Sequence, residues 1–381
     1  MLDVETTWLQ LDTRAMVFIF SVVVILFVLT VYLFFLSVWV RVSNQRTERR
    51  IEATKERLYP YILAFLEEGK SRETVSEQIK NDEDMIVFEE LVFEYIEQLR
   101  GQEFQKLQEL LAIPRLYKYR YKLLFSKDTG DRVQACYYFR KLARYTTEVQ
   151  NRLFYLLESK DQLQAHAAAS ALLSLSDINI REEAVTKVAR FSGLSRMAML
   201  EIMYKFIQMD EDQVEEETEA LQRIVQDIYI PEHNTAVIIE SIADMGYLML
   251  ADFIYDYYLN NTRPDPEGVL RQSLILVLGH FEYLEAADSI AHQQAGSRFP
   301  AIRKACANAL GKMQADQHLD VLEQLAHDDE FVVQMEAVQA LAKIIPEGKK
   351  SLERMTGDDG RLRFMAMDIL SRSSKLTHQE V

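Results

Sequence analysis

The side chains that most often carry out chemistry are few and scattered in this sequence. Its seven histidines form no His-x-x-x-His pair and none neighbours a cysteine; they are His166, His233, His280, His292, His318, His327 and His378. Metal ligands usually come in such close pairs, so this spacing does not predict a metal site, and we interpret the histidines as solvated or capping side chains. Cys136 and Cys306 are too few for a disulfide scaffold or a zinc site built on thiolates.

A short motif, Gly69-Lys70-Ser71, has the residues that end a phosphate-binding loop. The glycine expected five positions earlier is Ala64, and the preceding segment has a helical rather than a strand pattern, so we reject this motif. No nucleophile elbow, zinc-protease motif or paired-carboxylate arrangement of comparable specificity occurs. The sequence therefore predicts a protein that is not an enzyme, needs no cofactor and takes no small-molecule substrate.

One stretch, residues 115–144, interleaves cations with tyrosines and is the best candidate for contact with a partner or with lipid. Its densest part comprises Arg115, Tyr117, Lys118, Tyr119, Arg120, Tyr121 and Lys122. Such a pattern suits anionic lipid headgroups, a polyanion or an acidic partner. The alternative, which we favour, is an amphipathic helix whose long cationic side chains lie over its own apolar surface with their tips in water.

Two further patterns have ordinary structural explanations. The acidic stretch 210–219 is interpreted as a solvated loop followed by a helix start, where carboxylates are favoured. A run of methionines at helical spacing could form an adaptable binding groove, but core packing explains it more simply; it consists of Met197, Met199, Met203, Phe206 and Met209.

A long apolar segment lies near the N-terminus. Residues 15–40 are 26 residues without a charge, which at about 1.5 Å per residue is enough to cross a ~30 Å hydrocarbon core. They predict a retained transmembrane helix rather than a cleaved signal peptide, because the start is acidic, the run is long and no small-residue cleavage motif follows. Residues 41–57 hold six basic residues against three acidic ones, and basic flanks stay in the cytoplasm. We therefore expect a single-pass plasma-membrane protein with residues 1–14 outside and the remainder inside.

Composition narrows the fold further. With 12 Gly and 7 Pro in 381 residues, tight turns and glycine-rich loops are scarce, which favours an all-α protein over an all-β or dinucleotide-binding one. The formal charge of −16 argues against a general nucleic-acid binder. Residues 41–115 have amphipathic patterns and predict a helical stalk and N-terminal cap, in which Thr74 and Glu77 could form a capping box.

Residues 116–372 contain a repeat. The second position of its clearest copies falls at Arg271, Arg303, Gln334 and Arg363, at steps of 32, 31 and 29 residues. A period near thirty that is filled by two helices is typical of a solenoid, in which each helix pair buries its apolar face against the next. Alanines at the middle positions should let neighbouring helices approach closely. Residues 373–381 are expected to form a flexible tail.

These copies resemble HEAT repeats of the armadillo-like superfamily, in which an aspartate stands six residues before the arginine that opens the second helix. Asp265 and Arg271 match this pattern. The other copies keep only one member of the pair, Asp328 before Gln334 and Arg303 after Ser297. The resemblance implies an α-α superhelix, and such solenoids serve mostly as scaffolds, although a fold does not determine a function.

We therefore predict a membrane-anchored cytoplasmic scaffold or adaptor that binds protein partners. By analogy with anchored bacterial HEAT proteins, these partners would be cytoplasmic domains of membrane proteins, such as a cell-envelope or polysaccharide synthase, or a signalling complex. One alternative is a HEAT-like enzyme, such as a DNA glycosylase or a lyase; the glycosylase would need a cationic concave groove. Another is a module that docks on anionic lipid through residues 115–144.

Overall fold

The computed structural model describes residues 13–377 except residues 70, 100, 192, 208–212 and 359. Lys70 of the rejected phosphate-loop motif, His378, Met209 and the acidic residues 210–212 therefore lie outside the described residues. All regular secondary structure within the described ranges is helical, which confirms the predicted all-α class. The chain divides into two compact units, Met1–Tyr117 and Lys118–Val381, and each is described separately.

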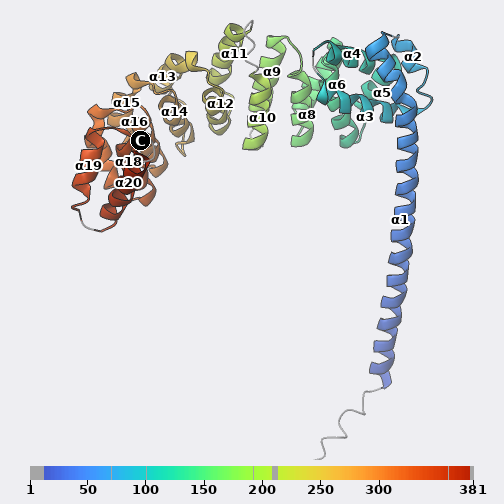
Figure 1. Cartoon of the computed structure of the whole chain (residues 1–381), viewed down its shortest axis with the longest axis horizontal. Helices are drawn as coiled ribbons and strands as arrows, with labels where there is room; N and C mark the ends of the chain where they lie inside the picture. The colour runs from blue at the N-terminus through green and yellow to red at the C-terminus, as the bar shows by residue number, and fades with distance from the viewer. Residues whose placement is uncertain are drawn as a thin grey trace, which may run out of the picture. The chain divides into compact units, whose positions relative to one another are not determined.

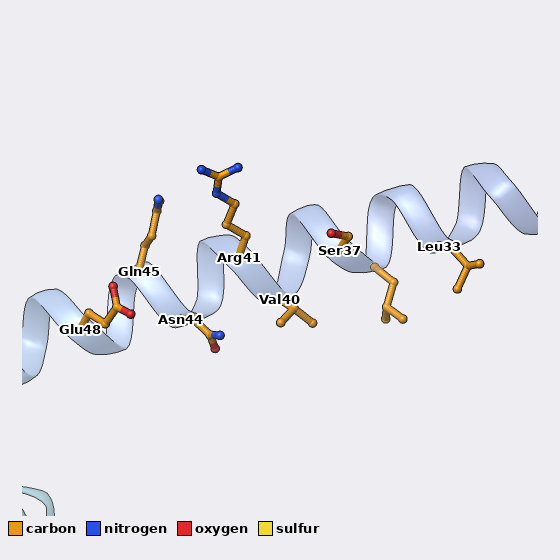
Figure 2. A pocket seen from close by; sticks show the side chains of 8 residues that line it. Leu33, Ser37, Val40, Arg41, Asn44, Gln45 and Glu48 are labelled. Atoms are coloured by element: carbon orange, nitrogen blue, oxygen red, sulfur yellow. The ribbon is translucent and has the colours of Figure 1, made fainter. Parts of the chain in front are cut away.

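The first unit is organised around one very long helix. Helix α1 (Thr13–Glu68) has 56 residues and contains the whole of the predicted transmembrane segment 15–40. It does not end where the apolar segment ends: Figure 2 shows Val40 directly followed by Arg41 on the same unbroken helix, with the polar Asn44 and Gln45 beyond. The hollow lined by these side chains is formed by the surface of α1 alone, so it is no enclosed cavity.

Within the described residues, α1 is the one helix long and apolar enough to cross a membrane, and its most apolar window has a mean hydropathy of 2.8 and no buried residue. A core helix of a globular protein would bury such side chains, because exposing them to water costs about 25 cal/mol per Å². The second half of α1 is different, since Leu58 and Ile62 are buried against the other helices of this unit.

Three short helices pack against that second half, α2 (Arg72–Ser76), α3 (Asp82–Gln98) and α4 (Gln102–Leu111). Ion pairs join α1 to α3: Arg57 Nη2 lies 2.7 Å from Asp84 Oδ2, and Lys55 Nζ lies 2.6 Å from Glu94 Oε1. The predicted capping box is wrong, because Thr74 lies inside α2 and the residue at its N-cap is Ser71. The boundary between the two units falls inside the next helix, α5 (Pro114–Leu123).

The second unit is a row of helix pairs, as Figure 1 shows. Even-numbered helices pack side by side and form the inner row of this unit: α6 (Thr129–Leu142), α8 (Gln162–Leu172), α10 (Arg196–Phe206), α12 (Glu232–Asp244), α14 (Val269–His280), α16 (Pro300–Lys312), α18 (Phe331–Lys343) and α20 (Arg361–Thr377). Odd-numbered helices form the outer row: α7 (Thr147–Leu157), α9 (Ile178–Ala189), α11 (Val214–Gln226), α13 (Ala251–Asn260), α15 (Ala287–Gln294), α17 (Leu319–Ala326) and α19 (Glu347–Met355). This arrangement confirms the predicted α-solenoid.

Small residues allow the inner helices to lie very close together. A Cβ atom built on Gly279 would lie 2.7 Å from the Cβ of Ala309, and one built on Gly311 would lie 2.6 Å from the Cβ of Ala340. Both alanines are fully buried or nearly so, as the repeat pattern predicts. Since protein interiors are close-packed, the backbone of the neighbouring helix occupies the space beside each glycine that a side chain would otherwise fill.

The turns from inner to outer helices share a conformation in three consecutive repeats. Each turn has one residue with positive φ, namely Gly246 (77°), Glu282 (51°) or Gln314 (50°), followed by a short 3-10 helix: η1 (Leu248–Leu250), η2 (Leu284–Ala286) or η3 (Asp316–His318). The amide of the following residue then bonds back to the inner helix, for example Tyr283 N to Leu278 O at 3.0 Å. This is the left-handed helix ending in which glycine is favoured.

Candidate functional site

The two arginines of the predicted contact stretch 115–122 make hydrogen bonds within the protein. Arg115, in the first unit, donates from Nη1 to Ile79 O at 3.0 Å and from Nη2 to Asp82 Oδ1 at 3.1 Å. In the second unit Arg120 is buried and donates to Gln134 Oε1 at 3.3 Å. The expectation that these cationic tips lie in water is therefore wrong for Arg120, which is buried, whereas Arg115 is exposed although its guanidinium also bonds to protein oxygens.

The other members of this stretch are divided between contacts and solvent. The Tyr121 hydroxyl donates to Glu148 on α7, and Tyr119 lies under the Arg120 guanidinium at 5.4 Å. The Tyr117 hydroxyl is buried in the first unit. Lys118 and Lys122 are exposed. The stretch thus exposes the cations Arg115, Lys118 and Lys122, whereas Arg120 is buried.

A ladder of polar side chains runs along the inner row, at the third or fourth residue of successive helices. Arg132, Gln164, Asn234, Arg271, Arg303, Gln334 and Arg363 occupy these positions, and Ala198 interrupts them on α10. Most of them donate to carbonyl groups at helix ends or in loops, as Arg303 Nη1 does to Ser297 O at 2.8 Å and Arg132 Nη1 to Ser126 O at 2.8 Å. They satisfy carbonyl groups that helices and loops would otherwise leave unpaired.

The incomplete aspartate–arginine pattern is rewired in a way the sequence did not reveal. Asp265 accepts from the backbone N of Arg271 at 2.8 Å, whereas the guanidinium of Arg271 donates to Tyr258 O at 2.7 Å. Arg303, which has no aspartate in its own repeat, bonds through Nε and Nη2 to both oxygens of Asp328 in the next repeat, at 2.6 and 2.7 Å.

The ladder residues of the last three inner helices differ in their surroundings. The bidentate pair links two repeats, and the guanidinium of Arg303 holds the pKa of Asp328 below its ordinary value. Gln334 donates to Asp328 O and so preserves part of the pattern. Arg363, on α20, is exposed.

The outer row contains a buried ionic cluster that sequence reasoning missed. Arg181 of α9 and Glu217 of α11 are both fully buried, with Nη2 and Oε1 2.9 Å apart, and the hydroxyl of buried Tyr247 donates to the other carboxylate oxygen at 2.6 Å. The prediction that residues 210–219 are solvated is therefore wrong for Glu217, because it neutralises a buried guanidinium. Only a contact between separate outer helices could have revealed it, since each side chain has charged neighbours in sequence.

Of the described residues in the methionine run, three are buried and one is exposed. Met199, Met203 and Phe206 are fully buried, which confirms core packing for them. Met197 is 73% exposed, so the prediction of core packing is wrong for this residue, which lies in the first turn of α10.

The potential nucleophiles and bases are in structural environments. Burial raises the pKa of the Cys136 and Cys306 thiols to about 12, so both are protonated and unreactive near neutral pH. His318 is buried and bonds through Nε2 to Asp288 Oδ1 at 2.7 Å, so the interpretation of a solvated side chain is wrong for it. Burial lowers the pKa of His166, whose Nε2 lies 3.1 Å from Glu201 Oε2. In the described part of the chain no group of three or more His, Cys, Asp and Glu side chains is arranged to hold a metal ion.

Comparison with known proteins supports the repeat assignment. Residues 258–342 match the family model of HEAT repeats, which covers helices α14 to α18 and confirms the predicted resemblance there. The chain is similar in structure to a crystallised mutant of Kap121p, with 13% identity over 84% of this chain and a TM-score of 0.38, and spans 40% of that protein's length. It is also similar to an engineered protein, with 16% identity over 67% of this chain and 95% of the other, and a TM-score of 0.22. No curated protein sequence matches.

Proposed function

We propose that this protein is a membrane-anchored scaffold whose HEAT solenoid binds protein partners at the cytoplasmic face of the plasma membrane. The observation that carries the proposal is α1: an apolar helix with a fully exposed surface that continues without interruption into a helical unit. Placing that surface in lipid removes it from water, and places the solenoid next to the bilayer.

Anchoring changes what affinity is needed. A partner that is itself in the membrane meets the tethered solenoid at a raised effective concentration, so contacts that are weak in solution suffice. Solenoids suit this role because stacked repeats present an extended surface rather than a single pocket. Cytoplasmic domains of a cell-envelope or polysaccharide synthase, or of a signalling complex, are the partners we propose.

The topology can be tested by labelling single cysteines in intact cells with a membrane-impermeant maleimide. In a background where Cys136 and Cys306 are replaced by Ala, a cysteine at position 6 should react from outside, whereas Lys160→Cys should react only after the cells are permeabilised. Reaction of Lys160→Cys in intact cells would overturn the proposed orientation.

The scaffold role is tested by in-cell crosslinking with the full chain and with a variant that lacks residues 15–40. The full chain should crosslink to a distinct set of membrane proteins, and the variant should lose them although its solenoid is still folded. If both forms recover the same proteins equally, the anchor does not contribute to partner binding.

The lipid-docking alternative has its own test. The exposed side chains of Arg115, Lys118 and Lys122 support it. Flotation of residues 44–381 with vesicles that contain phosphatidylserine, compared with neutral vesicles, would detect docking that does not depend on the anchor.

A further inference from the structure

Charge is sorted between the two rows of the second unit. Helices α6 to α20 of the inner row contain 14 Lys and Arg residues against seven Asp and Glu residues, and the outer helices α7 to α19 contain the reverse. The formal charge of −16 for the whole chain conceals this division. An acidic partner is therefore attracted to the inner side and repelled by the outer side of the same unit.

The excess is largest in the last three inner helices, α16, α18 and α20. They contain eight Lys and Arg residues, of which Arg303 is paired with Asp328, and two acidic residues, Glu336 and Asp368. Both acids have cationic partners: Glu336 Oε2 lies 3.9 Å from Lys304 Nζ, and Asp368 Oδ2 lies 2.9 Å from Arg372 Nη2. This end of the inner face is thus cationic with its carboxylates already engaged.

The cations have a regular register. Lys312, Lys343 and Arg372 each stand nine residues after a ladder position, at Arg303, Gln334 and Arg363, on three helices that pack side by side. On α16, helical geometry places Lys312 on the stripe with Ala301 and Lys304, opposite the buried Cys306 and Leu310. The three equivalent cations therefore form a row across the inner face.

Favourable charge at helix C-termini does not by itself explain this row. Lys312 and Lys343 lie in the last turn of their helices, where cations are favoured. Arg372, however, stands five residues before the end of α20, outside its last turn.

We propose that the inner face of α16, α18 and α20 binds an acidic peptide segment of a partner protein in the polyproline II conformation, with a carboxylate at every third residue. Neighbouring helix axes lie roughly 8–10 Å apart, and one three-residue turn of this conformation spans about 9 Å and returns every third side chain to the same face. One carboxylate then meets one cation on each helix.

A nucleic acid fits this surface less well. Duplex DNA carries about one charge per 1.7 Å, far denser than one cation per helix.

The inference rests on the proposed function only in taking a protein as the partner, and its test is independent of the anchor. The probe is a fluorescein-labelled peptide of four Glu-Leu-Thr repeats, and binding is followed by fluorescence anisotropy to the full chain in phosphatidylcholine nanodiscs. Lys312→Glu with Lys343→Glu should weaken binding about tenfold, since reversal turns two attractions into repulsions. The matched control, Lys349→Glu with Lys350→Glu on outer helix α19, should change it less than twofold.

A further comparison tests the register of the cations. A peptide of the same composition with its glutamates in one block should bind at least threefold more weakly. Circular dichroism of each variant confirms that the helices are retained.

The proposal is overturned if the inner and outer charge reversals have equal effects, or if a DNA duplex of equal charge displaces the peptide at lower concentration. If the peptide does not bind while the crosslinking experiment recovers anchor-dependent partners, the scaffold function stands and this surface is not its binding site.

Discussion

The inner and outer rows of the solenoid are built from the same kind of helix but are stabilised differently. Neighbouring inner helices lie so close that the backbone of one contacts the next without an intervening side chain, as at Gly311 and Ala340. Outer helices are separated by larger groups, including the buried pair Arg181–Glu217 between α9 and α11, and Tyr255 of α13, whose hydroxyl lies 3.1 Å from Ser289 Oγ of α15. Because neighbouring inner helices pack more closely than neighbouring outer helices, stacking similar helix pairs produces a curved row.

The difference teaches which changes each row tolerates. Between α9 and α11 the outer row contains a buried ion pair, and so it is sensitive there to loss of a charge. The inner row depends on the absence of atoms, and so it is sensitive to the addition of a methyl group. Single substitutions in each row can test this contrast.

The largest effect is expected in the outer row, from Glu217→Gln. This change leaves the Arg181 guanidinium buried without its counter-charge and should destabilise the second unit by about 3–5 kcal/mol. Urea denaturation followed by circular dichroism measures the loss. Glu219→Gln on the same helix is the control, because Glu219 is exposed and its pair with Arg223 should contribute less than about 1 kcal/mol. Equal effects of the two changes would contradict the assigned role of the buried pair.

In the inner row, Gly311→Ala should cost about 2–3 kcal/mol, because the new methyl group would lie 2.6 Å from the Cβ of Ala340 and force α16 and α18 apart. The matched control is Gly296→Ala, since a Cβ there meets no atom within 4 Å. Thermal unfolding compares the two variants. A neutral Gly311→Ala would show that the inner helices can separate without cost.

A smaller effect, dependent on pH, is expected where Arg303 links two repeats. The pKa of Asp328 is lowered from its ordinary value of 3.8 in the folded protein, so the stability it contributes is fully present above about pH 4 and is lost as the pH falls through the folded value. Asp328→Asn should therefore cost about 1–2 kcal/mol at pH 7 and much less at pH 2. Urea midpoints at the two pH values check this, and Asp329→Asn, beside it but exposed, should show neither effect.

The smallest effect concerns the turns that join the rows. Gln314 has a φ of 50°, where a side chain is strained, so Gln314→Gly should stabilise the protein by about 0.5–1 kcal/mol. The reverse change at the equivalent turn, Gly246→Ala, should destabilise it, because Gly246 has a φ of 77°. Thermal melts that move in the same direction for both variants would contradict the idea that the two turns share one conformation.

The sequence by itself determined the helical class, the apolar segment and the repeat. Each depends on local spacing: 26 uncharged residues, alanines at helical intervals, and copies about thirty residues apart. Local spacing also identified Met199 and Met203 as core residues, and it failed for Met197 because one residue of such a run can be exposed.

Only the tertiary structure decided which charged residues are buried and which are presented. Charged residues are usually exposed, and no local pattern indicates that Arg120, Arg181 or Glu217 is buried. Their partners lie 14, 36 and 30 residues away. Likewise, no window of sequence shows that the inner row is cationic and the outer row acidic, because the helices of each row alternate along the chain. Helices of one row are neighbours only because the repeats stack. Stacking therefore decides which charged residues share a surface, although they are a full repeat apart in the chain.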